Sequence, residues 1–186
     1  MIVYLVRHGK TKWSLEERIQ GWADSPLLPD DKSPEKAAEK LKGIHFDYVC
    51  SSDLGRAVET KRRILEILGI ENEENEHPEF REVGFGVLEG MPISVLKDEY
   101  ADLWRRYKTY SEDFVPSDFF EGFESVKDVK TRALDKLNEI KKIYGEDSTI
   151  LVIAHGSIMS ILEHDGKEID EPAVIIENGG VLKLEI

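Results

Sequence analysis

Four residues of this sequence have the chemistry needed to hold and attack a phosphate group: Arg7, His8, Arg56 and His155. Each of the two histidines is followed by a glycine, which allows the backbone to approach a ligand closely. Neutral imidazole is a competent nucleophile near pH 7, and guanidinium groups match phosphoryl oxygens in bidentate contacts. Any one of these residues alone is more often structural or solvated, but their combination predicts a phosphate site.

Three apolar runs are expected to bring these residues together. The runs 2–6 and 149–154 end directly at Arg7-His8 and at His155, and both are typical of buried strands. The run 46–50 is a third strand candidate, and Arg56 lies one turn into the helix expected after it. Because ligands of open α/β sheets bind at the carboxyl ends of the strands, all four residues are expected at one edge of a sheet.

The remaining sequence alternates helical and strand patterns. Helices are predicted at 33–41, 53–69, 93–107, 125–144 and 157–163, and closing strands at 173–176 and 181–186. This order predicts one α/β domain over residues 1–186, with three α/β/α layers and a mostly parallel central sheet. A small cap insertion is expected at about 85–122.

Composition limits the partners. The 186 residues carry 25 Lys+Arg against 38 Asp+Glu, a formal charge of −13, which repels nucleic acid and anionic membrane. We therefore expect a small phosphorylated metabolite as partner, no nucleic acid and no membrane, with a homodimer as a candidate assembly. The single Cys50, and the lack of a signal-peptide or membrane-spanning pattern, favour a cytoplasmic location. A charged fraction of 34% with a single glutamine suggests a thermophilic source.

Four motifs together resemble a known family. LVRHGKT (5–11), SSDLGRAVET (51–60), REVGFGVLEG (81–90) and IAHGS (153–157) resemble, in this order, the motifs of the histidine phosphatase superfamily, the phosphoglycerate-mutase-like group. The resemblance extends from Ile2 to about Asn178. Within the family, the sequence is similar to the small phosphatase branch, which includes ribazole-phosphate phosphatases. It implies a phosphoglycerate-mutase-like fold and an enzyme that needs neither metal nor cofactor.

The resemblance implies roles for the matching residues. His8 would take the phosphoryl group as a phosphohistidine, Arg7, Arg56 and His155 would hold its oxygens, and Glu82 would donate the proton to the leaving group. Further substrate contacts are expected from Ser14, Gln20, Gly21, Gly156, Arg105 and Arg106. Ser14 stands where the family often has asparagine, and Gln20 and Gly21 belong to the segment RIQGWADSPL (18–27), which borders the family's pocket.

The favoured function is hydrolysis of a small phosphomonoester. The sequence ends at Ile186, directly after the last expected strand, without the C-terminal tail of the family's mutases. Trp104-Arg105-Arg106 favours the opposite assignment, because it resembles a mutase segment that binds the substrate carboxylate. An ordinary amphipathic helix with an exposed basic face is the favoured explanation of these residues. The alternatives are a cofactor-dependent phosphoglycerate mutase and a catalytically silent binder of a phosphorylated ligand. A metal-dependent hydrolase with His8 and His155 as ligands is disfavoured, because no metal-ligand cluster is evident in the sequence.

Overall fold

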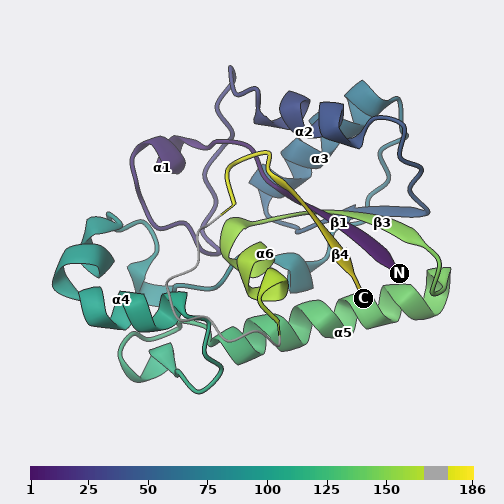
Figure 1. Cartoon of the computed structure of the whole chain (residues 1–186). Helices are drawn as coiled ribbons and strands as arrows, with labels where there is room; N and C mark the ends of the chain where they lie inside the picture. Colours follow the sequence, from purple (N-terminus) through teal and green to yellow (C-terminus); the bar gives the residue numbers. More distant parts are fainter. Residues whose placement is uncertain (166–175) are drawn as a thin grey trace.

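A computed structural model describes residues 1–165 and 176–186 of the chain and shows a four-stranded sheet (Figure 1). The strands are β1 (Ile2–Arg7), β2 (Tyr48–Ser51), β3 (Thr149–Ala154) and β4 (Val181–Glu185), in the order β2-β3-β1-β4. β1, β2 and β3 are parallel, and β4 is antiparallel to β1. The predicted mostly parallel sheet is confirmed, with one antiparallel strand at its edge.

Strand register places the two His-Gly pairs side by side. β1 and β3 are the central strands, and Arg7 lies opposite Ala154 in their parallel register. His8 and His155 therefore leave the sheet at the same edge. Ser51 pairs with Ile153, so β2 also ends at this edge, close to the start of the following helix.

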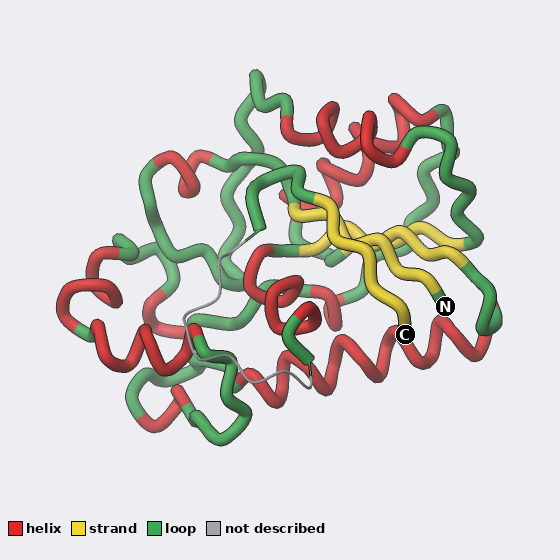
Figure 2. Tube along the Cα trace, viewed as in Figure 1, coloured by secondary structure: helices red, strands yellow, loops and turns green. Residues whose placement is uncertain are grey.

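Helices cover both faces of the sheet, as predicted for three layers (Figure 2). On one face lie α2 (Ser33–Leu41) and α3 (Gly55–Leu68), and on the other lie α5 (Val126–Tyr144) and α6 (Gly156–Glu163). Successive strand side chains alternate between the two cores, since strand side chains point alternately to opposite faces. Val6, Leu151 and Ile153 pack towards α2 and α3, whereas Val3, Leu5, Ile150 and Val152 pack towards α5 and α6.

The helical elements differ from prediction mainly in one place. The predicted helix 93–107 is instead a π-helical segment, Val95–Glu99, followed after Tyr100 by α4 (Ala101–Lys108). A short helix, α1 (Lys12–Leu15), was not predicted, and 3₁₀ turns lie at Pro78–Phe80, Gly86–Leu88 and Pro116–Asp118. The predicted strand 173–176 lies outside the described residues except for Ile176, which is not in a strand.

The two ends of the segment 85–122, here called the cap segment, lie next to each other. Phe85 and Phe123 form an isolated antiparallel bridge, and the Glu124 backbone N–H donates to the Gly84 carbonyl at 2.7 Å. Figure 1 shows α4, within this segment, at the opposite end of the molecule from the two chain termini. None of the helices in the described ranges is long and apolar enough to cross a membrane.

Candidate active site

His8 lies at the end of β1 and is buried, with 3% of its surface exposed. Its Nδ1 lies 2.7 Å from the Gly9 carbonyl oxygen. A carbonyl only accepts, so Nδ1 carries the proton and Nε2 keeps its lone pair. Burial, followed by the positive charges of Arg56 and Arg7, holds the pKa of His8 well below its ordinary value. His8 is thus neutral at pH 7, with one ring nitrogen free to act as a nucleophile.

The turn after His8 is fixed from two sides. Thr60, one turn along α3 from Arg56, accepts a hydrogen bond from the Gly9 backbone N–H at 3.0 Å through its hydroxyl. Asn178 donates from Nδ2 to the carbonyls of His8 and Gly9, at 2.9 and 3.1 Å. These hydrogen bonds restrict the backbone conformation at His8 and Gly9, and so fix the position from which the His8 imidazole extends.

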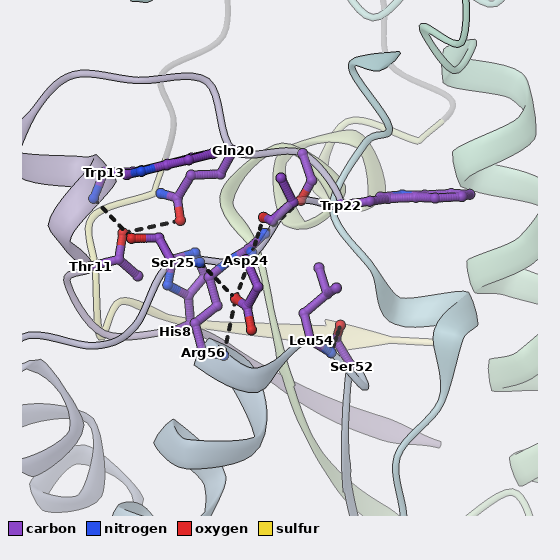
Figure 3. Close-up of polar contacts among 12 residues, drawn as sticks. His8, Thr11, Trp13, Gln20, Trp22, Asp24, Ser25, Ser52, Leu54 and Arg56 are labelled. Atoms are coloured by element: carbon purple, nitrogen blue, oxygen red, sulfur yellow. Dashed lines mark hydrogen bonds and ion pairs between the residues drawn. The ribbon is translucent and has the colours of Figure 1, made fainter. Parts of the chain in front are cut away.

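Arg56 enters the site from the first turn of α3 and is 1% exposed. Its guanidinium donates to the carbonyls of Gly21 and Ala23, at 2.7 and 2.9 Å, and to the Asp24 carboxylate at 3.1 Å. Figure 3 shows Arg56 and Asp24 joined beside His8. Burial lowers the pKa of Arg56, and the Asp24 carboxylate opposes this shift. An arginine stays protonated nonetheless, so a fixed positive charge faces the histidine.

Several buried polar atoms around His8 have no hydrogen-bond partner among the described residues: Arg7 Nε, Arg56 Nε and both ring nitrogens of His155. The His155 ring is fully buried, and its centroid lies 5.1 Å from that of His8. Burial, then the charge of Arg56, keeps the pKa of His155 well below its ordinary value. Orphaned buried donors are costly, and an anion bound between these groups would satisfy them.

Glu82 is 9% exposed and lies at the N-terminus of α6. Its carboxylate accepts backbone hydrogen bonds from Ser157 at 3.1 Å, Ile158 at 3.2 Å and its neighbour Val83 at 3.0 Å. Its charge also opposes the lowering of the Arg7 pKa that burial causes, so the two groups are close enough to interact. The carboxylate thus caps the helix that follows His155 while facing the cationic cluster.

A cavity of about 110 Å³ lies over these groups. Its walls are formed by Arg7, His8, Arg18, Ile19, Gln20, Gly21, Arg56, Glu82, Phe85, Ile93, Trp104 and Ser157. One side is therefore cationic, and the side contributed by the cap segment is apolar. The described residues contain no group of three or more histidine, cysteine, aspartate or glutamate side chains able to hold a metal ion.

The other predicted contacts divide into three groups. Gln20 and Gly21 line the cavity, and Gln20 accepts a hydrogen bond from the Thr11 hydroxyl at 3.0 Å (Figure 3). Gly156 is buried at the start of α6, beside the cavity residue Ser157 but not itself on the wall. Ser14 is also absent from the wall, because its hydroxyl contacts the Thr11 backbone N–H and hydroxyl as part of the α1 cap.

Arg105 and Arg106 do not reach this cavity, contrary to the prediction. Both are exposed on α4; Arg105 forms an ion pair with Asp102, and the Arg106 guanidinium lies 4.8 Å from the Phe114 ring centroid. The prediction failed because the inward face of α4 carries Trp104 and Tyr107, which turns the arginines to the other faces. Sequence reasoning also missed the wall residues Arg18, Ile19, Phe85, Ile93, Trp104 and Ser157. Several of these had a signal: Arg18 and Ile19 belong to the segment 18–27, Phe85 belongs to the motif 81–90, and Ser157 directly follows the second His-Gly pair.

A buried, neutral histidine surrounded by fixed cations and a carboxylate defines the site of a phosphoryl-transfer enzyme. The family model of the histidine phosphatase superfamily (branch 1) matches residues 3–186, and the chain belongs to this family.

Relatives and solved structures agree with this assignment. The chain is 34% identical over 161 residues to a protein named probable phosphoglycerate mutase GpmB from Enterobacter sp. (strain 638), covering 86% of this chain and 72% of that protein. Among solved structures, Bacillus stearothermophilus YhfR matches with a TM-score of 0.81 and 25% identity, over 100% of this chain and 91% of that one. Phosphoglycerate mutase from Bacillus anthracis str. Sterne matches with a TM-score of 0.74 and 26% identity, over 100% and 92%.

Proposed function

We propose that this protein is a metal-independent phosphatase that hydrolyses a small phosphomonoester through a phosphohistidine on His8. The single observation that carries the proposal is the free Nε2 of a neutral His8 beside Arg7 and Arg56, whose buried Nε atoms have no partner among the described residues. A dianionic phosphoryl group is the ligand that such a cluster fits.

In the first half of the reaction, the lone pair of His8 Nε2 attacks phosphorus and the bond from phosphorus to the ester oxygen breaks. Arg7, Arg56 and His155 hold the phosphoryl oxygens, where negative charge is distributed in the transition state. Glu82 enters this step in its protonated form, and the departing oxygen takes the proton from its carboxyl group. The products are the free alcohol and phosphohistidine, with Glu82 as a carboxylate.

In the second half, water attacks phosphorus and the bond to His8 Nε2 breaks. The Glu82 carboxylate accepts the proton from this water, and inorganic phosphate leaves. His8 regains its neutral form with the Nδ1 proton still donated to the Gly9 carbonyl, so both catalytic groups return to their starting states.

A phosphoglycerate mutase is the second candidate, and relatives that carry this name support it. In a mutase the phosphohistidine would transfer its phosphoryl group back to a phosphoglycerate, not to water. The exposure of Arg105 and Arg106 favours hydrolysis, because these are the residues that resemble the mutase segment for the substrate carboxylate.

Phosphate release from a panel of phosphomonoesters, measured with excess EDTA, tests the proposal. The panel should include p-nitrophenyl phosphate and 3-phosphoglycerate. We expect EDTA-resistant release that His8→Ala abolishes and that His45→Ala, a substitution of an exposed histidine, leaves unchanged. Release that EDTA abolishes would refute the metal-independent mechanism.

If no ester is hydrolysed by well-folded protein, the phosphatase proposal fails. Conversion of 3-phosphoglycerate to 2-phosphoglycerate after addition of 2,3-bisphosphoglycerate would then identify a mutase. Binding without either reaction would identify a silent phospho-ligand binder.

A further inference from the structure

Lys108 is a buried cation that the proposed mechanism does not use. It ends α4, with 6% of its surface exposed, and its Nζ donates one hydrogen bond, to the Tyr110 hydroxyl at 3.0 Å. The same Nζ lies 5.2 Å from the Tyr110 ring centroid and 5.7 Å from that of Trp104. Within residues 1–165 and 176–186, no carboxylate forms an ion pair with it.

The lysine lies beside the cavity that contains His8. Trp104, four residues earlier in α4, is on the same helix face and forms part of the cavity wall. The Lys108 ammonium also interacts with the charges of two cavity residues, since Glu82 raises its pKa and Arg7 lowers it. Burial is the largest influence and brings the pKa of Lys108 down to about 8.

The charge of this group is not balanced by a described residue. A buried ammonium normally pairs with a carboxylate, but among residues 1–165 and 176–186 the hydrogen-bond partner of Lys108 Nζ is a neutral phenol. The two arginines earlier in α4 are exposed and do not supply a cationic subsite at the cavity. The cavity over His8, about 110 Å³, suits a phosphoryl group, so the rest of a substrate must extend towards the walls that the cap segment contributes.

We propose that Lys108 binds a second anionic group of the substrate, a carboxylate or a second phosphate, and so selects phosphomonoesters that carry one. This inference rests on the proposed function, because it presumes that the substrate phosphoryl group lies against His8. Lys108 is buried without a counter-ion among the described residues, and the free energy that this burial costs is recovered when such a substrate binds.

The test uses two pairs of ligands, and the members of each pair differ only in the second anionic group. 3-Phosphoglycerate and glycerol 3-phosphate share a three-carbon skeleton, with a carboxylate in one replaced by a hydroxymethyl group in the other. Propane-1,3-diol bisphosphate and the corresponding monophosphate form a second pair, which separates the two chemical sources of negative charge. Affinities are measured by calorimetry in the His8→Ala background, where turnover does not occur.

In the pair that the subsite recognises, one ligand carries a second anionic group besides its phosphate. We expect Lys108→Met to weaken binding of this ligand by about 10- to 100-fold, the range for a desolvated charge pair. Binding of its matched partner should change by less than about threefold. Lys97→Met is the control, because Lys97 is an exposed lysine of the same cap segment. Lys108→Arg should retain part of the preference. With Lys108 intact, the preference should fall as the pH rises past about 8.

Equal effects of Lys108→Met on both members of both pairs would overturn the inference, as would ligand affinities that Lys108→Met leaves unchanged. Because Met removes an unpaired buried charge and keeps the side-chain length, we expect Lys108→Met to unfold at or above the temperature of the parent protein. The binding assay does not depend on phosphate release. Failure of hydrolysis and failure of the Lys108 subsite are therefore distinguishable.

Discussion

Replacement of Arg132 by methionine should destabilise the protein and slow catalysis, although Arg132 does not line the cavity. Arg132 lies on α5, and its guanidinium binds both oxygens of the Glu124 carboxylate, at 2.7 and 2.9 Å. The same guanidinium donates to three backbone carbonyls of the segment 79–82: that of Glu79 at 2.6 Å and those of Arg81 and Glu82 at 2.9 Å. It thus connects α5 to the backbone that carries Glu82.

The magnitude follows from burial. The two side chains are 17% and 14% exposed, so their ion pair is largely, though not fully, removed from water. Removal of one partner of a buried pair costs roughly 3–5 kcal/mol, and we take the lower end, about 3 kcal/mol, for this partly hydrated pair. The Glu82 carbonyl keeps a second donor, Trp22 Nε1 at 2.8 Å. Loss of one of two anchors predicts a displacement of well under 1 Å and a decrease in kcat of about tenfold.

Urea unfolding of Arg132→Met and of Arg62→Met measures the first effect. Arg62 is 51% exposed and pairs with Glu59 and Glu66 on the surface of α3, so its replacement should cost less than about 1 kcal/mol. Phosphate release then gives kcat for each variant, with Arg132→Lys included because it keeps the charge. If Arg132→Met loses no more stability than Arg62→Met, the inferred role of this network is wrong.

Three further outcomes are expected. The pKa values of His8 and His155 are lowered in the folded state, so the unfolded chain binds more protons below about pH 6.5. The free energy of unfolding in urea should therefore decrease as the pH falls from 7.5 to 5.5, by up to about 1.4 kcal/mol per pH unit for each histidine. A flat profile would contradict the burial of these two rings. Gly21→Ala should lower the free energy of unfolding by at least about 2 kcal/mol, because Gly21 has a φ of +57° and an added Cβ would collide with the Glu89 carboxylate. Gly43→Ala, at a φ of +79° with open space around it, should lower it by about 1 kcal/mol; thermal or urea unfolding measures both. The Cys50 thiol is fully buried and its pKa is raised by burial, so a disulfide reagent should modify it only after unfolding; rapid modification of native protein would refute this placement.

The sheet and the cationic cluster were predictable because local sequence determines both. Apolar runs of four to six residues that end abruptly at charge are a strong strand signal, and parallel strands must place their carboxyl ends at one edge. His8 and His155 follow from this rule alone, since each directly follows its strand. Arg56 follows because a helix begins shortly after β2 and extends back over the same edge.

The partners that hold these residues were not predictable, because they come from distant parts of the chain. Asn178 reaches His8 across about 170 residues of sequence, and Asp24 reaches Arg56 across about 30. Contacts at such separations depend on loop geometry, which periodicity does not determine. Thr60 is the exception in principle, because it lies four residues after Arg56 on a helix face that must turn towards the first strand.

The cap segment shows most clearly where a sequence pattern fails. The sequence pattern predicts a single helix over 93–107, in which all residues would share one helical phase. That prediction does not determine which way the Arg105 and Arg106 side chains point. The π-helical segment Val95–Glu99 and the irregular Tyr100, with φ of −126° and ψ of 37°, separate α4 from the preceding turn, so the phase of α4 is set by its own packing. Trp104 and Tyr107 stack with centroids 5.5 Å apart and define the inward face. Lys108 lies four residues after Trp104 and shares its helix face, and a lysine in phase with inward-facing aromatic residues is a sequence signal for a buried cation.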